Sequence, residues 1–301
     1  MLDCLVIGGG PAGLTAAIYL ARFHLSVAVI DSGQSRAALI PLTRNHAGFP
    51  DGIAGVDLLD RMRAQARLYG VRIEHGTVDA LDHNPDGFVA RHALGTLAGR
   101  TVLLATGVVN RRPEIIDDAC HDRALATGRL RYCPICDGYE VSDKIIAVLG
   151  TGDRGCHEAL FLRGYTKSIT LVAPGPNHDL SAEQARSLAQ AGIALAGPVT
   201  AIGLAHGGIV LDLPEGPVLF DSLYPALGSD IRSELAGQLG ADCSGEGCLM
   251  VDTHQRTSVP GLYAAGDVVL GLDQISHAMG EGGVAATTIR NDLAAKTPLR
   301  R

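Results

Sequence analysis

The sequence predicts an α/β fold with two Rossmann-like dinucleotide-binding domains, the second inserted in the first. Residues 4–31 align without gaps on residues 146–173. Each copy begins with an apolar run typical of a buried parallel strand, passes through Gly-x-Gly-x-x-Gly into a helical pattern, and returns to an apolar strand. A third observation is the late stretch "GLYAAGD" at 261–267, which resembles a short strand ending in Gly-Asp. This order predicts that the chain returns to the first domain after the insertion.

Length and composition fit a globular protein of this kind. The 301 residues allow two domains, with 47% hydrophobic and 19% charged residues. The net charge of -7 comes without a run dense in Lys or Arg, so we expect no nucleic-acid or membrane partner. The apolar stretch 5–14 contains glycines and a proline and is too short to span a bilayer, so it is expected to belong to the fold. Seven scattered cysteines argue against a disulfide framework and favour a cytoplasmic protein.

The first copy carries a full set of dinucleotide-binding features. Gly8 permits a tight turn, Gly10 lets the backbone approach a pyrophosphate, and Gly13 allows the helix to pack on the strand. Pro11 and Ala12 open that helix. Asp31 ends the second strand, where a carboxylate can accept hydrogen bonds from a ribose. Strand, helix and acid together favour dinucleotide binding over a purely structural turn.

The second copy keeps the turn and the helix start, at Gly150, Gly152, Asp153 and Gly155. Alanine at position 173 replaces the acid that Asp31 supplies in the first copy, and "APGPNHDLS" follows. His178 is the only nearby side chain that could meet a 2′-phosphate, and a lone loop histidine is usually solvated. Two alternatives stay open for this copy: it binds a nicotinamide nucleotide, or it keeps the fold and binds poorly or not at all.

The segment "CPICDGYE" at 133–140 places two thiols two residues apart. Half of a zinc site would need further ligands, and Cys243 and Cys248 are the nearest alternative pair. Inert core thiols would need apolar neighbours, whereas the Pro, Asp and Gly here indicate a turn at a helix start, which favours thiolates. We therefore interpret Cys133 and Cys136 as a redox dithiol, with Asp137 as the acid or base that carries the thiol proton. No metal is expected.

These features together resemble the low-molecular-weight thioredoxin reductases, and the likeness spans nearly all of the chain. Its specific elements occur in the family's order, with Gln274 after the last of them: "GGGPAGLTAAIYLAR" at 8–22, "NHAGFP" at 45–50, "LLATG" at 103–107, "CPICDG" at 133–138, "GTGDRGCHEALFL" at 150–162 and "TSVPGLYAAGD" at 257–267. The resemblance implies an FAD-binding domain in two parts, 1–110 and 234–301, around an inserted NAD(P)-binding-like domain, 111–233.

The resemblance also implies a site for each part of FAD. The pyrophosphate would lie over the Gly8–Gly13 loop and the adenosine ribose at Asp31. Other positions would surround the adenosine, approach the flavin or line the cofactor, namely Ser32, Arg36, Asn45, Val78, Ala105, Thr106, Gly107, Asp267 and Gln274. In the family pattern Cys136 faces the flavin, Cys133 attacks the partner's disulfide, and Asp137 donates a proton. The partner would be a thioredoxin-like protein, the enzyme a homodimer, and the inserted domain would swing between the two reactions.

Two departures leave the electron donor open. Family members carry His-Arg-Arg and a further Arg after the second-domain strand to hold the 2′-phosphate of NADPH, where this chain has "APGPNHD". A basic residue usually precedes the terminal Gln, where this chain has Asp273. NADPH, NADH and ferredoxin remain candidate donors. Two other functions remain alternatives: a dithiol oxidase that closes disulfides in a small molecule and passes electrons to oxygen, and a flavin-bound redox sensor without turnover.

Overall fold

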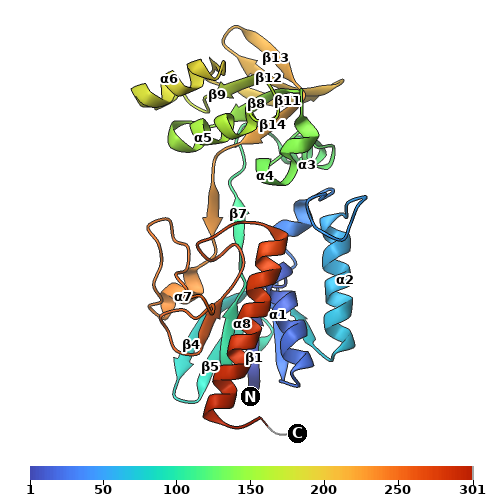
Figure 1. Ribbon diagram of the computed structural model, residues 1–301, viewed down its shortest axis with the longest axis vertical. Helices are drawn as coiled ribbons and strands as arrows, with labels where there is room; N and C mark the ends of the chain where they lie inside the picture. The colour runs from blue at the N-terminus through green and yellow to red at the C-terminus, as the bar shows by residue number, and fades with distance from the viewer. Residues whose placement is uncertain (300–301) are drawn as a thin grey trace.

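The computed structural model describes residues 1–299 and places two α/β bodies end to end (Figure 1). The larger body is built on a seven-stranded sheet in the order β3-β2-β1-β6-β5-β4, with β16 also paired to β6. Its strands are β1 (Leu2–Ile7), β2 (Val27–Asp31), β3 (Arg72–His75), β4 (Val78–Asn84), β5 (Gly87–His92), β6 (Gly95–Leu104) and β16 (Leu262–Ala264). The parallel strands β3, β2, β1, β6 and β16 end at one edge, while β4 and β5 continue the sheet in antiparallel pairing.

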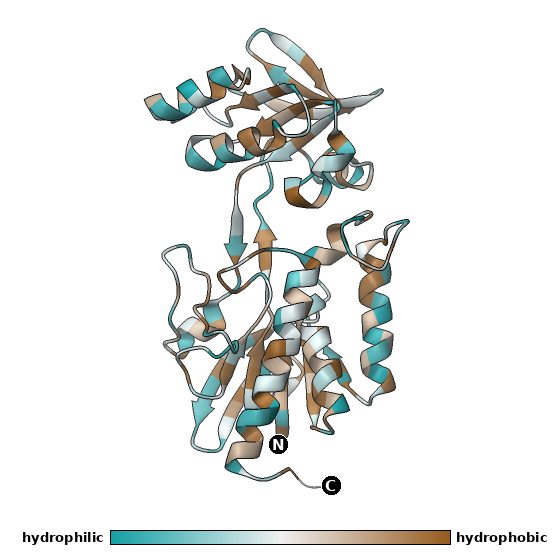
Figure 2. Cartoon of the chain, viewed as in Figure 1, coloured by the Kyte–Doolittle hydropathy of each residue, from teal (hydrophilic) through white to brown (hydrophobic). Residues whose placement is uncertain are grey.

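Strand β1 explains why its sequence is apolar throughout. Cys4 and Val6 belong to one buried cluster, and Leu5 and Ile7 belong to another on the opposite face. A strand buried on both faces needs an apolar side chain at every position. Figure 2 shows the same hydrophobic colouring in the central strands, whereas outer helices carry hydrophilic stripes.

Helices cover the Cys4 face, and a smaller helix with loops covers the other. The helices of this body are α1 (Pro11–Arg22), α2 (Gly55–Leu68), α7 (Glu234–Gln238) and α8 (Ile275–Lys296), with a short 3₁₀ turn, η1 (Arg36–Leu39). Helices α1 and α8 lie side by side in Figure 1, and their alanines share the cluster with Cys4 and Val6. The C-terminal helix α8 thus packs on the first βαβ unit, so the chain returns to the first domain as the sequence predicts.

The contact between α1 and α8 gives a stability prediction. A Cβ added at Gly282 would overlap the carbonyl oxygen of Ala12, whereas a Cβ at Gly280 meets nothing within 4 Å. We expect Gly282→Ala to lower the free energy of unfolding by about 1–3 kcal/mol, because the helices must separate. Gly280→Ala, on the same helix, should raise it by about 0.4–1 kcal/mol. Chemical denaturation of both variants measures the difference, and equal stability would contradict this packing.

The smaller body contains a parallel sheet in the order β10-β9-β8-β14 and an antiparallel sheet in the order β11-β12-β13. Its strands are β8 (Ile145–Leu149), β9 (Ser168–Val172), β10 (Ala194–Ala196), β11 (Ala201–Ala205), β12 (Gly208–Leu213), β13 (Gly216–Phe220) and β14 (Ser222–Pro225). Its helices are α3 (Asp118–Ala126), α4 (Pro134–Asp137), α5 (Gly152–Leu162) and α6 (Ala182–Gln190), with a 3₁₀ turn, η2 (Gly138–Val141). The unit β8-α5-β9 repeats β1-α1-β2 at the positions that the sequence alignment predicts, which confirms the two Rossmann-like units.

The two bodies are joined where β7 (Val108–Asn110) pairs with β15 (Ser229–Ile231) in antiparallel fashion. The chain leaves the larger body along one strand and returns along the other, so the insertion has adjacent ends (Figure 1). We propose the domain boundaries near these crossings, at 110/111 and 233/234.

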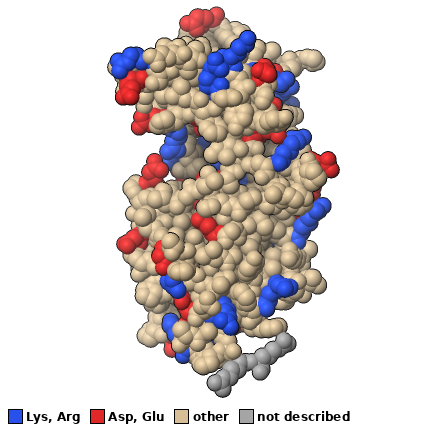
Figure 3. Space-filling model, viewed as in Figure 1, with Lys and Arg blue, Asp and Glu red and all other residues tan. Residues whose placement is uncertain are grey.

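Charged side chains of both signs are mixed on the face shown in Figure 3. Within residues 1–299, no helix combines the length and the hydrophobicity that crossing a bilayer requires.

Candidate functional site

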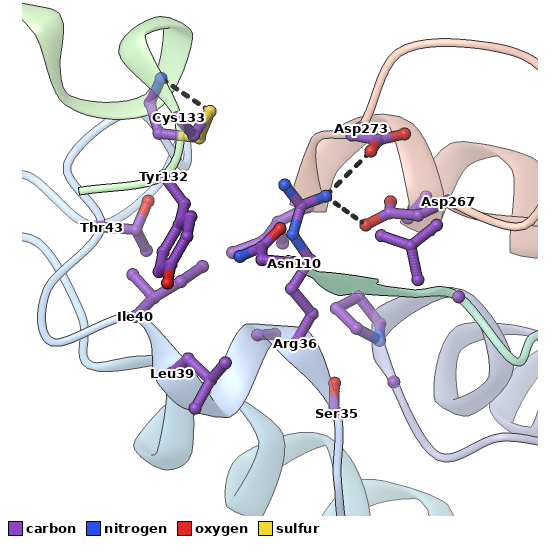
Figure 4. Close-up of a pocket in the computed structure, with 18 of the residues that line it drawn as sticks. Ser35, Arg36, Leu39, Ile40, Thr43, Asn110, Tyr132, Cys133, Asp267 and Asp273 are labelled. Atoms are coloured by element: carbon purple, nitrogen blue, oxygen red, sulfur yellow. Dashed lines mark hydrogen bonds and ion pairs between the residues drawn. A yellow bond between two sulfur atoms is a disulfide. The ribbon is translucent and has the colours of Figure 1, made fainter. Parts of the chain in front are cut away.

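A cavity of about 360 Å³ is lined by residues of both bodies. The larger body contributes the first glycine loop, the η1 region and the start of α8, and the smaller body contributes Cys133 and Cys136. Figure 4 shows side chains of both bodies facing this space. The predicted dinucleotide site and the predicted dithiol are therefore parts of one site.

The first glycine loop fits an anionic group. Gly8 has φ +110, and an added Cβ would overlap the carbonyl of Ala105, so only glycine is accepted there. Helix α1 begins at Pro11 with Gly10 as its N-cap, no side chain caps it, and its first turn holds no acid. The unpaired amides and the helix dipole are thus available to a pyrophosphate, and Gly8 to Ala12 line the cavity. Gly13 lies beneath the loop, where a Cβ would overlap the carbonyl of Gly8.

Asp31 stands at the end of β2, only 7% exposed, and lines the cavity. Its Oδ1 accepts a hydrogen bond from the Gly33 amide at 3.0 Å, and its Oδ2 lies 3.3 Å from Arg63 Nη2. The arginine offsets the cost of burying this carboxylate. Ser32 also lines the cavity, whereas Val78 begins β4, is buried and is not part of the lining.

Arg36 joins two acids across the cavity (Figure 4). Its Nη1 lies 3.1 Å from Asp267 Oδ2 and 2.8 Å from Asp273 Oδ2. Burial raises the pKa of Asp273, and the like charge of Asp267 adds to this. The sequence analysis noted Asp273 as an acid where the family usually has a basic residue, and expected Arg36 near the adenosine. It missed the ion pair between them because 237 residues separate the two.

Thr106, Ala105 and Gly107 line the cavity where the chain leaves the sheet. Thr106 Oγ1 donates to the carbonyl of Arg232 at 2.6 Å, which ties the outgoing segment to the returning one. These residues therefore both line the cavity and connect the two segments that join the bodies.

Cys133 and Cys136 form a disulfide, with their Cα atoms 5.3 Å apart. Cys133 is the N-cap of the one-turn helix α4, and its Sγ accepts from the Cys136 amide at 3.2 Å. Both cysteines are partly exposed. Among residues 1–299 no group of three potential metal ligands is present, so the zinc alternative finds no further ligands in the described chain.

The side chain of Gln274 spans the gap between the larger body and the disulfide. Its Nε2 lies 3.4 Å from Cys133 Sγ and 3.3 Å from Cys136 Sγ. Its Oε1 accepts a hydrogen bond from Asn45 Nδ2 at 2.9 Å. The resemblance puts both amides near the flavin; in the structure Gln274 contacts the sulfurs, and Asn45 lies behind it in the cavity wall.

Asp137 is held by two donors from its own body. Its Oδ2 accepts from Arg131 Nη1 at 2.8 Å, and its Oδ1 accepts from the Tyr224 hydroxyl at 2.7 Å. Burial raises the pKa of Asp137, and the two donors offset this only in part. Close by, burial raises the pKa of Glu158 to about 7. The sequence singled out Asp137 but neither donor; a tyrosine within the short strand at 222–225 was the one available signal.

The second glycine loop differs from the first in a way that the pattern did not show. The Gly152 amide, counterpart of Gly10, donates to the carbonyl of His178 at 2.9 Å, and the Thr151 hydroxyl donates to the same oxygen. Asp153 adds a negative charge to the first turn of α5. Burial lowers the pKa of His178, which favours its neutral form. The carbonyl of His178 thus takes the amide that would face a pyrophosphate in this loop, and the carboxylate of Asp153 adds a like charge there.

Known proteins resemble this chain over nearly its whole length. The model of the pyridine nucleotide-disulphide oxidoreductase family matches residues 2–282. Thioredoxin reductase of Streptomyces clavuligerus is 35% identical, over 97% of this chain and 94% of that protein. The crystal structure of HlmI is 30% identical and has a TM-score of 0.90, over 98% of this chain and 93% of that one. Thioredoxin reductase from Streptococcus pyogenes is 27% identical, with a TM-score of 0.89 over 98% and 99%.

The matches agree with the geometry of the cavity. They cover both bodies, the first glycine loop and the disulfide. The chain belongs to the pyridine nucleotide-disulphide oxidoreductase family, as an FAD-dependent flavoprotein of the thioredoxin reductase type.

Proposed function

We propose that this protein passes electrons through FAD and the Cys133–Cys136 pair to the disulfide of a thioredoxin-like protein. The observation that carries the proposal is the position of the disulfide in the wall of the same cavity as the first glycine loop. Bound FAD would supply the two-electron chemistry that links a donor to this disulfide. The name of the Streptomyces relative supports a thioredoxin-like protein as the partner.

The residues of the larger body suit the parts of FAD. We propose that the Gly8–Ala12 amides hold the pyrophosphate and that Asp31 accepts hydrogen bonds from the adenosine ribose, with Ser32 and the backbone at Val78 nearby. Asp267, fixed by Arg36, would hold the ribityl region. Asn45, Ala105, Thr106, Gly107 and Gln274 would border the flavin end of the cavity.

The dithiol reaction uses groups of the smaller body. After reduction, Cys133 would attack the partner's disulfide as a thiolate, forming a mixed disulfide, and Cys136 would then displace the partner's sulfur. Asp137 is placed to hold and return the proton, because burial raises its pKa while Arg131 and Tyr224 fix its orientation. Ile135 and Tyr139, beside the pair, are 50% and 82% exposed and would contact the partner.

Neither nicotinamide nucleotide is expected to be an efficient donor through the second loop. Loss of one hydrogen bond to a charged phosphate lowers affinity by about 10- to 100-fold, and here the Gly152 amide is already paired. Anaerobic titration of the yellow protein with NADPH, NADH and reduced ferredoxin, followed by flavin bleaching, measures the preference.

We expect slow bleaching by both nucleotides, with dithionite as the positive control, and rapid bleaching by reduced ferredoxin would identify it as the donor. A variant in which 174–180 is shortened should bind nucleotide more tightly, because the Gly152 amide becomes free. Stoichiometric, rapid reduction by NADPH would refute the expectation about the donor. Failure of all donors to reduce the flavin would remove the reductase proposal itself.

A dithiol oxidase that passes electrons to oxygen is the second candidate, because the occupied second loop leaves no built site for a nucleotide donor. The acid after the second cysteine, Asp137, differs from the histidine expected in such oxidases. Release of peroxide on mixing the protein with small dithiols in air would favour this candidate.

We also propose a cytoplasmic homodimer. Tyr19 on α1, Phe23 directly after that helix and Val284 on α8 are 45%, 37% and 40% exposed, and the two helices pack together. An exposed apolar strip on adjacent helices is typical of a subunit interface. Sedimentation of the purified protein tests the assembly, and a monomer at all concentrations would exclude it.

A further inference from the structure

We propose that Gln274 is a hydrogen-bond donor to the reacting sulfurs, and that it stabilises the thiolate formed when the Cys133–Cys136 bond opens. Its Nε2 lies within 3.4 Å of both sulfur atoms. The nitrogen is closer to Cys136 Sγ than Oε1 is, at 3.3 Å against 3.7 Å. The inference rests on the proposed function only for the source of the electrons.

A chain of hydrogen bonds runs from the larger body to the Gln274 amide. The Thr43 hydroxyl donates to Asn45 Oδ1 at 2.9 Å, so Asn45 Nδ2 is left to donate to the next residue. Asn45 Nδ2 donates to Gln274 Oε1 at 2.9 Å, which leaves the Gln274 NH₂ group for the sulfurs. The start of the chain is anchored, because Thr43 is buried and its backbone pairs with Ile53. The larger body therefore supports the orientation in which the Gln274 NH₂ group faces the sulfurs.

The direction of the effect follows from the electron count. Two electrons, delivered by the bound flavin, and one proton convert the disulfide into one thiol and one thiolate. A thiolate accepts hydrogen bonds more strongly than a disulfide sulfur, because it carries charge. The donor therefore stabilises the reduced pair, and it does so only where the smaller body holds the sulfurs against Gln274. Asp137 with Arg131, and Glu140 with Arg44, are the charged groups around the pair, and they stay unchanged in the variants below.

Equilibration of the FAD-loaded protein with mixtures of reduced and oxidised dithiothreitol measures the effect directly, because the alkylated fraction of Cys133 and Cys136, read by peptide mass spectrometry, gives the equilibrium constant. We expect Gln274→Met to shift this constant about tenfold towards the disulfide, since one hydrogen bond to a charged group is lost. A tenfold shift corresponds to about 30 mV. Asn45→Leu should act in the same direction although Gln274 remains, because the leucine side chain has no N–H to donate to Oε1 and the Gln274 NH₂ group is then no longer held towards the sulfurs.

Ser276→Ala is the matched control: this serine follows Gln274 closely and bonds to His46 instead, so its removal should leave the constant unchanged. If Gln274→Met loses FAD, Gln274→Leu takes its place, with the same expected direction. Wild-type equilibrium in the Gln274 variants at equal FAD content would overturn the inference. Dithiothreitol supplies the electrons, so the measurement needs no nucleotide, ferredoxin or protein partner, and a failure of the proposed function would leave it readable.

Discussion

Replacing either Cys133 or Cys136 with serine is expected to abolish reduction of a protein disulfide. The two electrons leave the protein only when a dithiol becomes a disulfide, and a single thiol cannot complete that exchange. The flavin of both variants should still be reduced by dithionite, which separates loss of the dithiol from loss of the cofactor. Steady-state turnover with thioredoxin measures the loss, and Cys243→Ser is the control, because Cys243 is exposed and unpaired in the structure.

The two serine variants should also differ from each other. If Cys133 is the attacking thiol, Cys136→Ser will accumulate a stable mixed disulfide with thioredoxin, since no second thiol resolves it. Cys133→Ser should trap far less, which mass spectrometry of the non-reduced protein can measure. Equal trapping by both variants would remove the assignment of distinct roles, and turnover in either would remove the dithiol from the mechanism.

Asp137→Asn is expected to lower kcat/KM for the disulfide substrate by about 10²–10⁴-fold, the contribution typical of a general acid or base. The asparagine keeps the shape of the side chain but cannot carry the proton. Flavin content and thermal stability should stay close to those of the wild type, and stopped-flow mixing of the reduced enzyme with thioredoxin isolates the affected step. Activity within a few-fold of wild type would show that the proton travels by another route.

The pH dependence provides an independent test of the same carboxyl. As an acid, Asp137 works when protonated, so activity should fall as pH rises through its raised pKa. The Tyr224 hydroxyl stabilises the carboxylate and lowers that pKa, so Tyr224→Phe should move the falling limb to higher pH. Tyr263→Phe is the matched control, because its hydroxyl donates to Asp292 at the same distance of 2.7 Å in the other body. If the falling limb of the pH profile moves equally in both variants, the shift does not come from the Tyr224 contact with Asp137.

Much of the fold could be predicted from local sequence patterns. The units β1-α1-β2 and β8-α5-β9 were predictable because a strand buried on both faces, a glycine turn and a helix each leave a contiguous signal in the sequence. Asp31 and the Cys133–Cys136 pair were predictable because their chemistry depends on spacing within such units.

What sequence reasoning missed depends on contacts between distant segments. Tyr224 reaches Asp137 across 87 residues, and Arg36 reaches Asp273 across 237. The occupied second loop was beyond prediction for another reason: the blocking group is the carbonyl of His178, and backbone carbonyls are present at every position. The sequence left nucleotide binding there open, and only the path of 174–180 shows what fills the loop.

The strand pair β7-β15 has a consequence for engineering. Because Thr106 and Arg232 are hydrogen-bonded neighbours, the inserted body enters and leaves the larger one at almost a single point. Excising it and rejoining the chain with a short linker is therefore expected to leave the strands of the seven-stranded sheet in register. The same geometry makes the dithiol-bearing body an exchangeable module. Replacing it with the corresponding body of a relative that uses another electron donor is therefore a practical route to changing the donor while keeping the flavin-binding body.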